Sequence, residues 1–128
     1  MPTECEVRQV LLRSLIVDDN ESFLEVARAR LEQDGLRVEG VASGSAEALR
    51  QAAALHPDVV LVDIFLGSES GLELTRELVA GGNPVILIST YAEDDVAQLI
   101  ADSPAAGFLR KSELSAETIR RIVNGRPG

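Results

Sequence analysis

Short apolar runs along the chain predict strands, and most of them lack the alternation of polar and apolar positions that a half-exposed strand shows. The clearest run is VVLV at residues 59–62, which continues through Asp63 into Ile64, Phe65 and Leu66. Such a run is typical of a strand buried on both faces, as in a parallel sheet covered by helices. The other runs are SLIV at 14–17, VILIS at 85–89, AAGFLRK at 105–111, and LRVEGVA at 36–42, which alternates as a more exposed strand would.

A segment with the apolar periodicity or the capping residues of a helix follows each of the five runs. Asn20 is placed to cap a helix with apolar positions at Phe23, Leu24, Ala27 and Leu31, and Gly35 is its stop signal. Two more helices begin at capping-box spacings, and the one near Glu93 should end before Ser103. Those spacings are Ser70 with Glu73 and Thr90 with Glu93; the remaining helices are SGSAEALRQAAAL at 43–55, ended by His56 and Pro57, and SELSAETIRRIV at 112–123.

This alternation predicts an α/β fold. Five strands alternating with five helices imply right-handed crossovers and a five-stranded parallel sheet, in a flavodoxin-like (βα)5 three-layer sandwich. Ligands bind at the carboxyl ends of the strands in such sheets. Polar residues stand at those ends on four of the five strands: Asp18 and Asp19, Asp63, Ser89 and Thr90, and Lys111. Any one of these could be an ordinary cap or turn residue, but their joint occurrence at one edge favours a site.

Composition limits the classes of protein to consider. The 128 residues suit one domain, predicted at residues 13–124, with a flexible leader at 1–12 and a tail or start of a linker at 125–128. The net charge of −9 argues against direct binding to nucleic acid or to an anionic membrane. Cys5 is the only cysteine, so no intrachain disulfide can form, and without a signal peptide or membrane span a cytoplasmic location is expected.

The residues at the strand ends suit metal-assisted phosphoryl chemistry. Three carboxylates repel one another, by about 4 kcal/mol for a pair about 4 Å apart at an effective dielectric of about 20. Lys111 offsets one charge, leaving a formal −3 + 1 = −2 that a divalent cation would neutralise. Because all candidate ligands are oxygens, Mg²⁺ is the expected cation and a phosphoryl group its natural guest. Asp63, central and on a rigid strand, is the best candidate nucleophile, with Ser89 and Lys111 meeting the developing charge.

These residues resemble the motif set of a response-regulator receiver domain of two-component signalling, over nearly everything from Ser14 to Val123. The aspartate pair matches Asp18 and Asp19, the phosphoacceptor matches Asp63, and Gly71 with Leu72 matches the glycine-leucine pair after the acceptor loop. The hydroxyl residue of the fourth strand matches Ser89, and the lysine after the fifth strand matches Lys111. Together these motifs are highly specific.

The resemblance implies that Asp63 takes a phosphoryl group from a histidine kinase or phosphotransfer protein. Asp19, Asp63 and the backbone carbonyl of Phe65 would hold Mg²⁺, with Asp18 acting directly or through water. Ser89 and Phe108, in the switch-aromatic position, would move on phosphorylation. The domain would then catalyse only its own phosphorylation and dephosphorylation, and signal or form a homodimer through its fourth helix, fifth strand and fifth helix.

Several positions depart from the usual pattern of that family. Gly67 stands where proline is common, so the acceptor loop is expected to be more mobile. Ser112 replaces a proline after the lysine, and GFLRKSEL is similar to receivers of the NarL/FixJ kind, so a missing C-terminal helix-turn-helix domain could bind DNA and regulate transcription. Phe65 and Tyr91 occupy the two positions that flank the hydrolytic water, and since Phe65 cannot orient water by hydrogen bonding, slow dephosphorylation is expected.

Two other classes of protein compete with this interpretation. A phosphatase of the haloacid-dehalogenase kind needs a second aspartate two residues after the nucleophile, where this chain has Phe65. A protein-interaction module on the same fold that works without phosphorylation is the more serious alternative, because sequence cannot show that a kinase exists. The intact acidic set argues against it.

Overall fold

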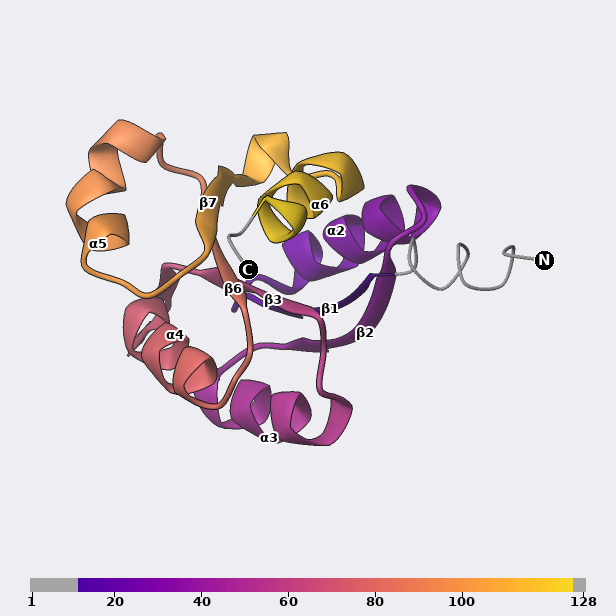
Figure 1. Ribbon diagram of the computed structural model, residues 1–128, viewed down its shortest axis with the longest axis horizontal. Helices are drawn as coiled ribbons and strands as arrows, with labels where there is room; N and C mark the ends of the chain where they lie inside the picture. Colours follow the sequence, from indigo (N-terminus) through magenta and orange to yellow (C-terminus); the bar gives the residue numbers. More distant parts are fainter. Residues whose placement is uncertain (1–11, 126–128) are drawn as a thin grey trace.

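The computed structural model describes residues 12–125, and its core is one parallel sheet (Figure 1). The strands are β1 (Arg13–Val17), β2 (Arg37–Ala42), β3 (Val59–Asp63), β6 (Val85–Ser89) and β7 (Gly107–Arg110), in the order β2-β1-β3-β6-β7. All four neighbouring pairs are parallel. The predicted fold class is confirmed. The expected leader lies outside the described residues except for Leu12, and the expected tail except for Gly125.

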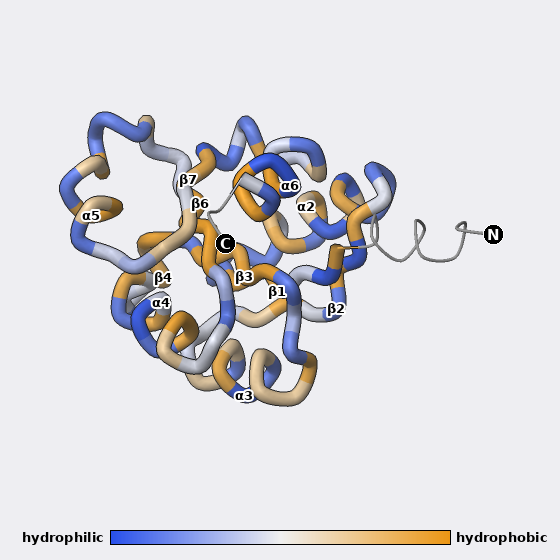
Figure 2. The backbone as a smooth tube through the Cα atoms, viewed as in Figure 1, coloured by the Kyte–Doolittle hydropathy of each residue, from blue (hydrophilic) through white to orange (hydrophobic). Residues whose placement is uncertain are grey.

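Helices cover both faces of the sheet, which makes three layers (Figure 1). Helices α2 (Glu21–Gln33) and α6 (Ala116–Asn124) pack on one face, with Leu24, Leu31 and Ile119 among their buried residues. Helices α3 (Ser45–Leu55), α4 (Gly71–Ala80) and α5 (Ala97–Ala101) lie on the other face. Because the central strands β1, β3 and β6 are buried from both sides, their sequences are continuously apolar, and they form the hydrophobic centre of the molecule (Figure 2).

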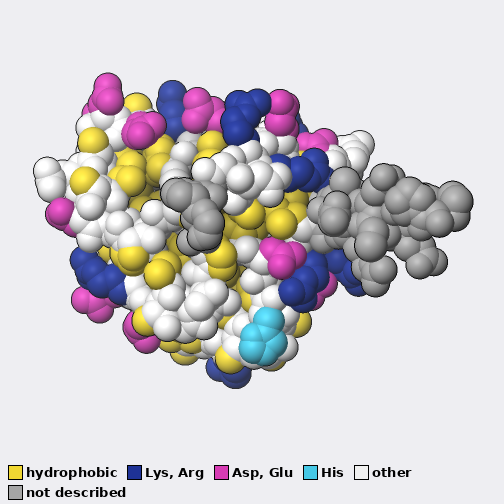
Figure 3. Space-filling model, in the orientation of Figure 1, with side chains coloured by type: hydrophobic (Ala, Val, Ile, Leu, Met, Phe, Trp, Pro, Cys, Tyr) yellow, Lys and Arg dark blue, Asp and Glu magenta, His cyan; other side chains and the backbone are white. Residues whose placement is uncertain are grey.

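Several of the predicted helix ends are confirmed. The side chain of Asn20 caps α2 by accepting the Phe23 N–H at 3.1 Å, and Ser70 caps α4 by accepting the Glu73 N–H at 3.2 Å. Helix α3 ends at His56, which adopts a left-handed conformation with φ of 49°. The only histidine in the chain is exposed, as the cyan atoms of Figure 3 show.

The helix expected from Glu93 is shorter and less regular than its sequence suggested. Residues Glu93–Val96 form a 3₁₀ turn, η1, and only the five residues of α5 are α-helical. The Thr90 capping box is wrong, because the extended residue before the turn is Ala92, which has no side-chain oxygen to accept a hydrogen bond. The last helix also starts later than expected: Lys111–Glu113 form a second 3₁₀ turn, η2, and Ser115 caps α6.

The stretch after Asp63 also differs from a continuous strand. The parallel ladder of β3 stops at Asp63, and Phe65–Leu66 (β4) pairs antiparallel with Glu69–Ser70 (β5) in a small hairpin. Gly67 opens the two-residue turn with a φ of 61°, a conformation that glycine adopts without steric cost. The loop after Asp63, for which Gly67 predicts greater mobility, thus contains a paired turn. Within residues 12–125, every helix is too short or too polar to cross a bilayer.

Candidate functional site

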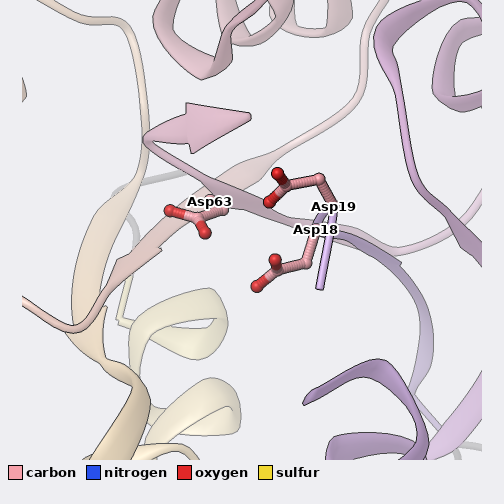
Figure 4. A group of neighbouring side chains, drawn as sticks. All are labelled: Asp18, Asp19 and Asp63. Carbon is pink, nitrogen blue, oxygen red and sulfur yellow. The ribbon is translucent and has the colours of Figure 1, made fainter. Parts of the chain in front are cut away.

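Three aspartates meet at the carboxyl edge of the sheet, where β1 and β3 lie side by side. Asp18 and Asp19 follow β1 directly, and Asp63 ends β3. Figure 4 shows the three side chains near one another, and each offers an oxygen within 4.8 Å of the others. Asp18 is fully buried, Asp63 is 7% exposed and Asp19 is exposed. The edge therefore presents an acidic cluster that is buried on one side and open to ligands on the other.

Lys111 bridges the two buried carboxylates. Its Nζ lies 2.6 Å from Asp18 Oδ2 and 3.0 Å from Asp63 Oδ2, and only 14% of its side chain is exposed. Burial alone would lower the pKa of Lys111, but its hydrogen bonds to Asp18 and Asp63 and their charges outweigh burial, so the pKa lies above its usual 10.5. The ammonium is therefore charged at neutral pH and offsets one of the three negative charges.

Burial acts on the pKa of Asp63 in the direction opposite to its effect on Lys111, because the charged form of a carboxyl is the deprotonated one. It raises the pKa of this carboxyl above its usual 3.8, and the charge of Asp18 adds to the effect, against the opposing influence of Lys111 and the Phe65 N–H. Keeping the buried carboxyl of Asp63 charged therefore costs free energy, and a further cation bound nearby would reduce that cost.

Backbone hydrogen bonds fix the orientation of both buried carboxylates. Asp18 Oδ1 accepts the Asn20 N–H at 2.9 Å, and Asp63 Oδ1 accepts the Phe65 N–H at 3.1 Å. Asp18 Oδ2 is buried and, apart from its ion pair with Lys111, accepts no hydrogen bond from residues 12–125. Buried carboxylate oxygens that accept so few hydrogen bonds, next to the exposed carboxylate of Asp19, are suitable ligands for a hard divalent cation. The donor set fits Mg²⁺, with a formal charge of −3 + 1 = −2 to neutralise.

Two glycines allow the hairpin formed by β4 and β5, called the acceptor hairpin below, to pack close to this cluster. A Cβ on Gly67 would lie 3.0 Å from Asp19 Oδ2, and a Cβ on Gly71 would collide with the main-chain carbonyl oxygen of Asp63. The Glu69 side chain reaches from β5 to helix α3, where its Oε1 accepts the Ser45 N–H at 2.9 Å. Helix α3 has glycine at its N-cap and no cap from its own side chain, so Glu69 takes that part.

The remaining candidate residues lie along β6 and β7, next to Asp63. Ser89 is buried at the end of β6, one residue beyond Ile88, which pairs with Asp63. Its Oγ accepts the Tyr91 N–H at 3.1 Å. Phe108 is half-buried on β7 beside Leu87. The structure thus brings the acidic set, Lys111 and Ser89 to one edge, with Phe108 one strand further out.

Three features of the site were not foreseen. Phe65 and Tyr91 form an edge-to-face pair with ring centroids 5.6 Å apart, although both remain about half exposed. Phe23, expected only as an apolar position of α2, has its ring 4.4 Å from Lys111 Nζ. Glu69, to which the sequence assigned no role, reaches α3. Such contacts join residues far apart in the sequence, so local spacing carries no signal for them.

Comparisons with known proteins agree on the family. Residues 14–124 match the family model described as the response regulator receiver domain. The chain is 33% identical over 115 residues to the response regulator GacA of Pseudomonas viridiflava, covering 88% of this chain and 54% of that protein. It is 30% identical over 123 residues to the transcriptional regulatory protein LiaR of Bacillus subtilis, covering 91% and 58%. The chain spans about half the length of these relatives.

Solved structures are similar over nearly the whole chain. The signal receiver domain of the response regulator NarL from Mycobacterium tuberculosis has a TM-score of 0.79 at 27% identity, covering 91% of this chain and 98% of that one. The receiver domain of a modulated diguanylate cyclase from Desulfovibrio desulfuricans has a TM-score of 0.76 at 34% identity, covering 90% and 92%.

Proposed function

Because the chain belongs to the response regulator receiver domain family, we propose that Asp63 accepts a phosphoryl group from a histidine kinase or phosphotransfer protein and that the resulting aspartyl phosphate switches the domain. The observation that carries this proposal is the bridge from Lys111 to Asp18 and Asp63. In this bridge the ammonium lies against the buried carboxylate that we propose as the nucleophile, and the cluster still has negative charge that could bind a metal.

Transfer requires little covalent chemistry from the protein. An Asp63 oxygen attacks phosphorus, an O–P bond forms, the P–N bond to the donor imidazole breaks, and the bond electrons leave with that imidazole. Mg²⁺, held by Asp19, Asp63 and the Phe65 carbonyl, with Asp18 direct or through water, would neutralise charge on the phosphoryl oxygens. Lys111 supplies a second positive charge. The Phe65 N–H holds one Asp63 oxygen, which limits the orientations of the nucleophile.

Ser89 and Phe108 are the residues through which phosphorylation would change the conformation. The Ser89 oxygen accepts the Tyr91 N–H, which leaves its hydroxyl proton available to a phosphoryl oxygen. Movement of Ser89 toward that oxygen would shift the segment leading to Tyr91 and make room for Phe108 to turn inward. The change is a shift between two packings, favoured by contacts that only the phosphorylated form can make.

The output surface is proposed to be α5 with η1, β7 and α6, as a homodimer interface or as a contact with another domain. Relatives of about twice this length include a transcriptional regulatory protein, which supports control of transcription through a separate DNA-binding domain. The acidic receiver itself, at −9, is not expected to bind DNA. Its partner kinase would meet it in the cytoplasm.

Incubation with Mg²⁺ and acetyl phosphate, followed by intact-protein mass, tests the proposal. We expect a gain of one phosphoryl group that is absent in Asp63→Asn. Beryllofluoride with Mg²⁺, which mimics the phosphoryl group, should bind the wild type in calorimetry. Repeated turnover of the donor with release of phosphate would indicate a phosphatase, and no response to either reagent would favour the interaction module that works without phosphorylation.

A further inference from the structure

The ring of Phe23 lies over the lysine of the site. Lys111 Nζ is 4.4 Å from the ring centroid, within the range of a cation–π interaction. Phe23 is in the first turn of α2 and half-buried, and the Lys111 side chain is 14% exposed. The ammonium thus has carboxylates on one side, at 2.6 and 3.0 Å, and an aromatic face on another.

The backbone of Phe23 is linked through Asn20 to the same carboxylate that binds the lysine. Asp18 Oδ1 accepts the Asn20 N–H, and Asn20 Oδ1 accepts the Phe23 N–H. Asp18 Oδ2 meets Lys111, whose ammonium returns to the Phe23 ring. These contacts close a ring through four residues. The cap that starts α2 therefore holds the backbone that carries the Phe23 ring next to the site.

The contacts of Lys111 with the two carboxylates and with the Phe23 ring would respond differently to binding of a metal ion and a phosphoryl group. Asp18 and Asp63 are also the carboxylates expected to face the cation and, in the case of Asp63, to carry the phosphoryl group. Their attraction for the ammonium weakens when a divalent cation shares their charge. The lysine ammonium sits at the end of a flexible four-carbon chain, so it needs another contact to stay in place. The Phe23 ring carries no charge and does not compete for the metal.

We propose that Phe23 is a positioning residue that holds the Lys111 ammonium at the acceptor edge through its ring face while Asp18 and Asp63 engage the cation and the phosphoryl group. This inference rests on the proposed function for its catalytic consequence. The contact itself is a property of the unphosphorylated domain and can be measured separately.

Lys111 is the only lysine in the chain, which makes it directly observable. In protein labelled at the lysine side chain, one folded-state methylene signal next to Nζ is expected in the NMR spectrum. Because the side chain lies over a ring, that signal should be shifted upfield from its position in the unfolded protein. Phe23→Leu should remove the shift, and Phe23→Tyr should retain it. A wild-type signal at the unfolded position would overturn the contact.

Fluorinated phenylalanines placed at position 23 test the role of the ring face without changing its shape. Successive fluorines withdraw electron density from the face, so the rate of phosphorylation by acetyl phosphate with Mg²⁺ should fall stepwise. Loss of the whole interaction corresponds to a fall of about 2- to 30-fold, since such contacts contribute about 0.5–2 kcal/mol. Phe23→Tyr should keep most of the rate, and urea midpoints measured alongside identify any variant that is merely unfolded.

The two proposals fail in different ways. A wild type that takes no phosphoryl group on Asp63 contradicts the proposed function, and with it the catalytic consequence of the Phe23 contact. A wild type that is phosphorylated, together with fluorinated and Phe23→Leu proteins that react at the same rate, contradicts the positioning role alone.

Discussion

Replacing Lys111 by methionine tests whether the lysine stabilises the folded domain by offsetting the charges of the acidic cluster. The change keeps an unbranched apolar side chain of similar length but removes the one positive charge that, among residues 12–125, forms ion pairs with Asp18 and Asp63. Both carboxylates lose a partner at 2.6 and 3.0 Å, and Asp18 is fully buried. We expect the variant to fold but to be much less stable than the wild type.

The magnitude follows from the distances. The ligand oxygens of the three aspartates lie within 4.8 Å of one another, so a pair of these charges repels by at least about 3 kcal/mol at an effective dielectric of about 20. Removing one partner of a buried ion pair costs about 3–5 kcal/mol in other proteins. A loss of about 3 kcal/mol is therefore expected in metal-free buffer at neutral pH. For a urea m-value of about 1.5 kcal/mol/M, the midpoint of unfolding should fall by about 2 M.

The loss should depend on pH in a defined direction. The pKa of Asp63 already lies above 3.8 in the wild type, chiefly through burial, so the folded state binds this proton more tightly than the unfolded state does. Stability from such a group is complete below pH 3.8 and declines as pH rises through the raised pKa. Without Lys111 the pKa of Asp63 should rise further. The deficit of the variant should therefore be largest near neutral pH and shrink in acid.

Urea unfolding with and without Mg²⁺ provides the assay, and Lys111→Met combined with Asp63→Asn is the matched control. Mg²⁺ should narrow the gap between Lys111→Met and wild type, because the variant site has one more uncompensated negative charge to bind the cation. In the double variant, the lysine substitution should cost much less than it does alone. Equal midpoints for wild type and Lys111→Met without metal, or an undiminished cost in the double variant, would refute the reasoning.

Three further predictions concern the acceptor hairpin. Phe65→Asn should shorten the lifetime of the phosphoryl group, because an amide can orient the attacking water and a phenyl ring cannot; the decay of phosphorylated protein by intact mass measures it, and an unchanged or longer lifetime would exclude the idea. Gly67→Ala should cost about 1–2 kcal/mol in urea and weaken Mg²⁺ binding, because alanine is strained at a φ of 61° and its Cβ would crowd Asp19 Oδ2 at 3.0 Å. Glu69→Ala should cost about 1 kcal/mol by removing the carboxylate that caps α3 at Ser45, while Glu69→Gln, which can still accept the N–H, should cost less; equal urea midpoints for both variants and wild type would argue against the cap.

The positions of Asp18, Asp63 and Lys111 were predictable because strand direction places them. Buried parallel strands are continuously apolar, so their carboxyl ends can be identified and must meet at one edge. The course of the chain after Asp63 was harder to predict from the sequence. A run through Leu66 is consistent with one strand, and the hairpin depends on Gly67 and on pairing with Glu69–Ser70.

The helix after β6 shows a second limit of local pattern. Thr90 and Glu93 have the spacing of a capping box, but the chain at Ala92 is extended and the turn begins beyond it. Phe23 shows a third: its helical period places it correctly on α2, yet its contact with Lys111 depends on how α2 lies relative to η2, which begins at Lys111. Periodicity indicates which side of a helix is buried, and tertiary packing decides what each buried side chain meets.

The central claim is that Asp63, and no other carboxylate, carries the phosphoryl group. Borohydride reduction of the phosphorylated protein converts an aspartyl phosphate to homoserine, and cleavage after arginine separates Asp63 from Asp18 and Asp19, which lie in another peptide. The Asp63 peptide also contains Asp58, an internal control. Tandem mass spectrometry should find homoserine at position 63 alone. Homoserine at Asp58, Asp18 or Asp19, or none in protein incubated with Mg²⁺ and acetyl phosphate, would contradict the account.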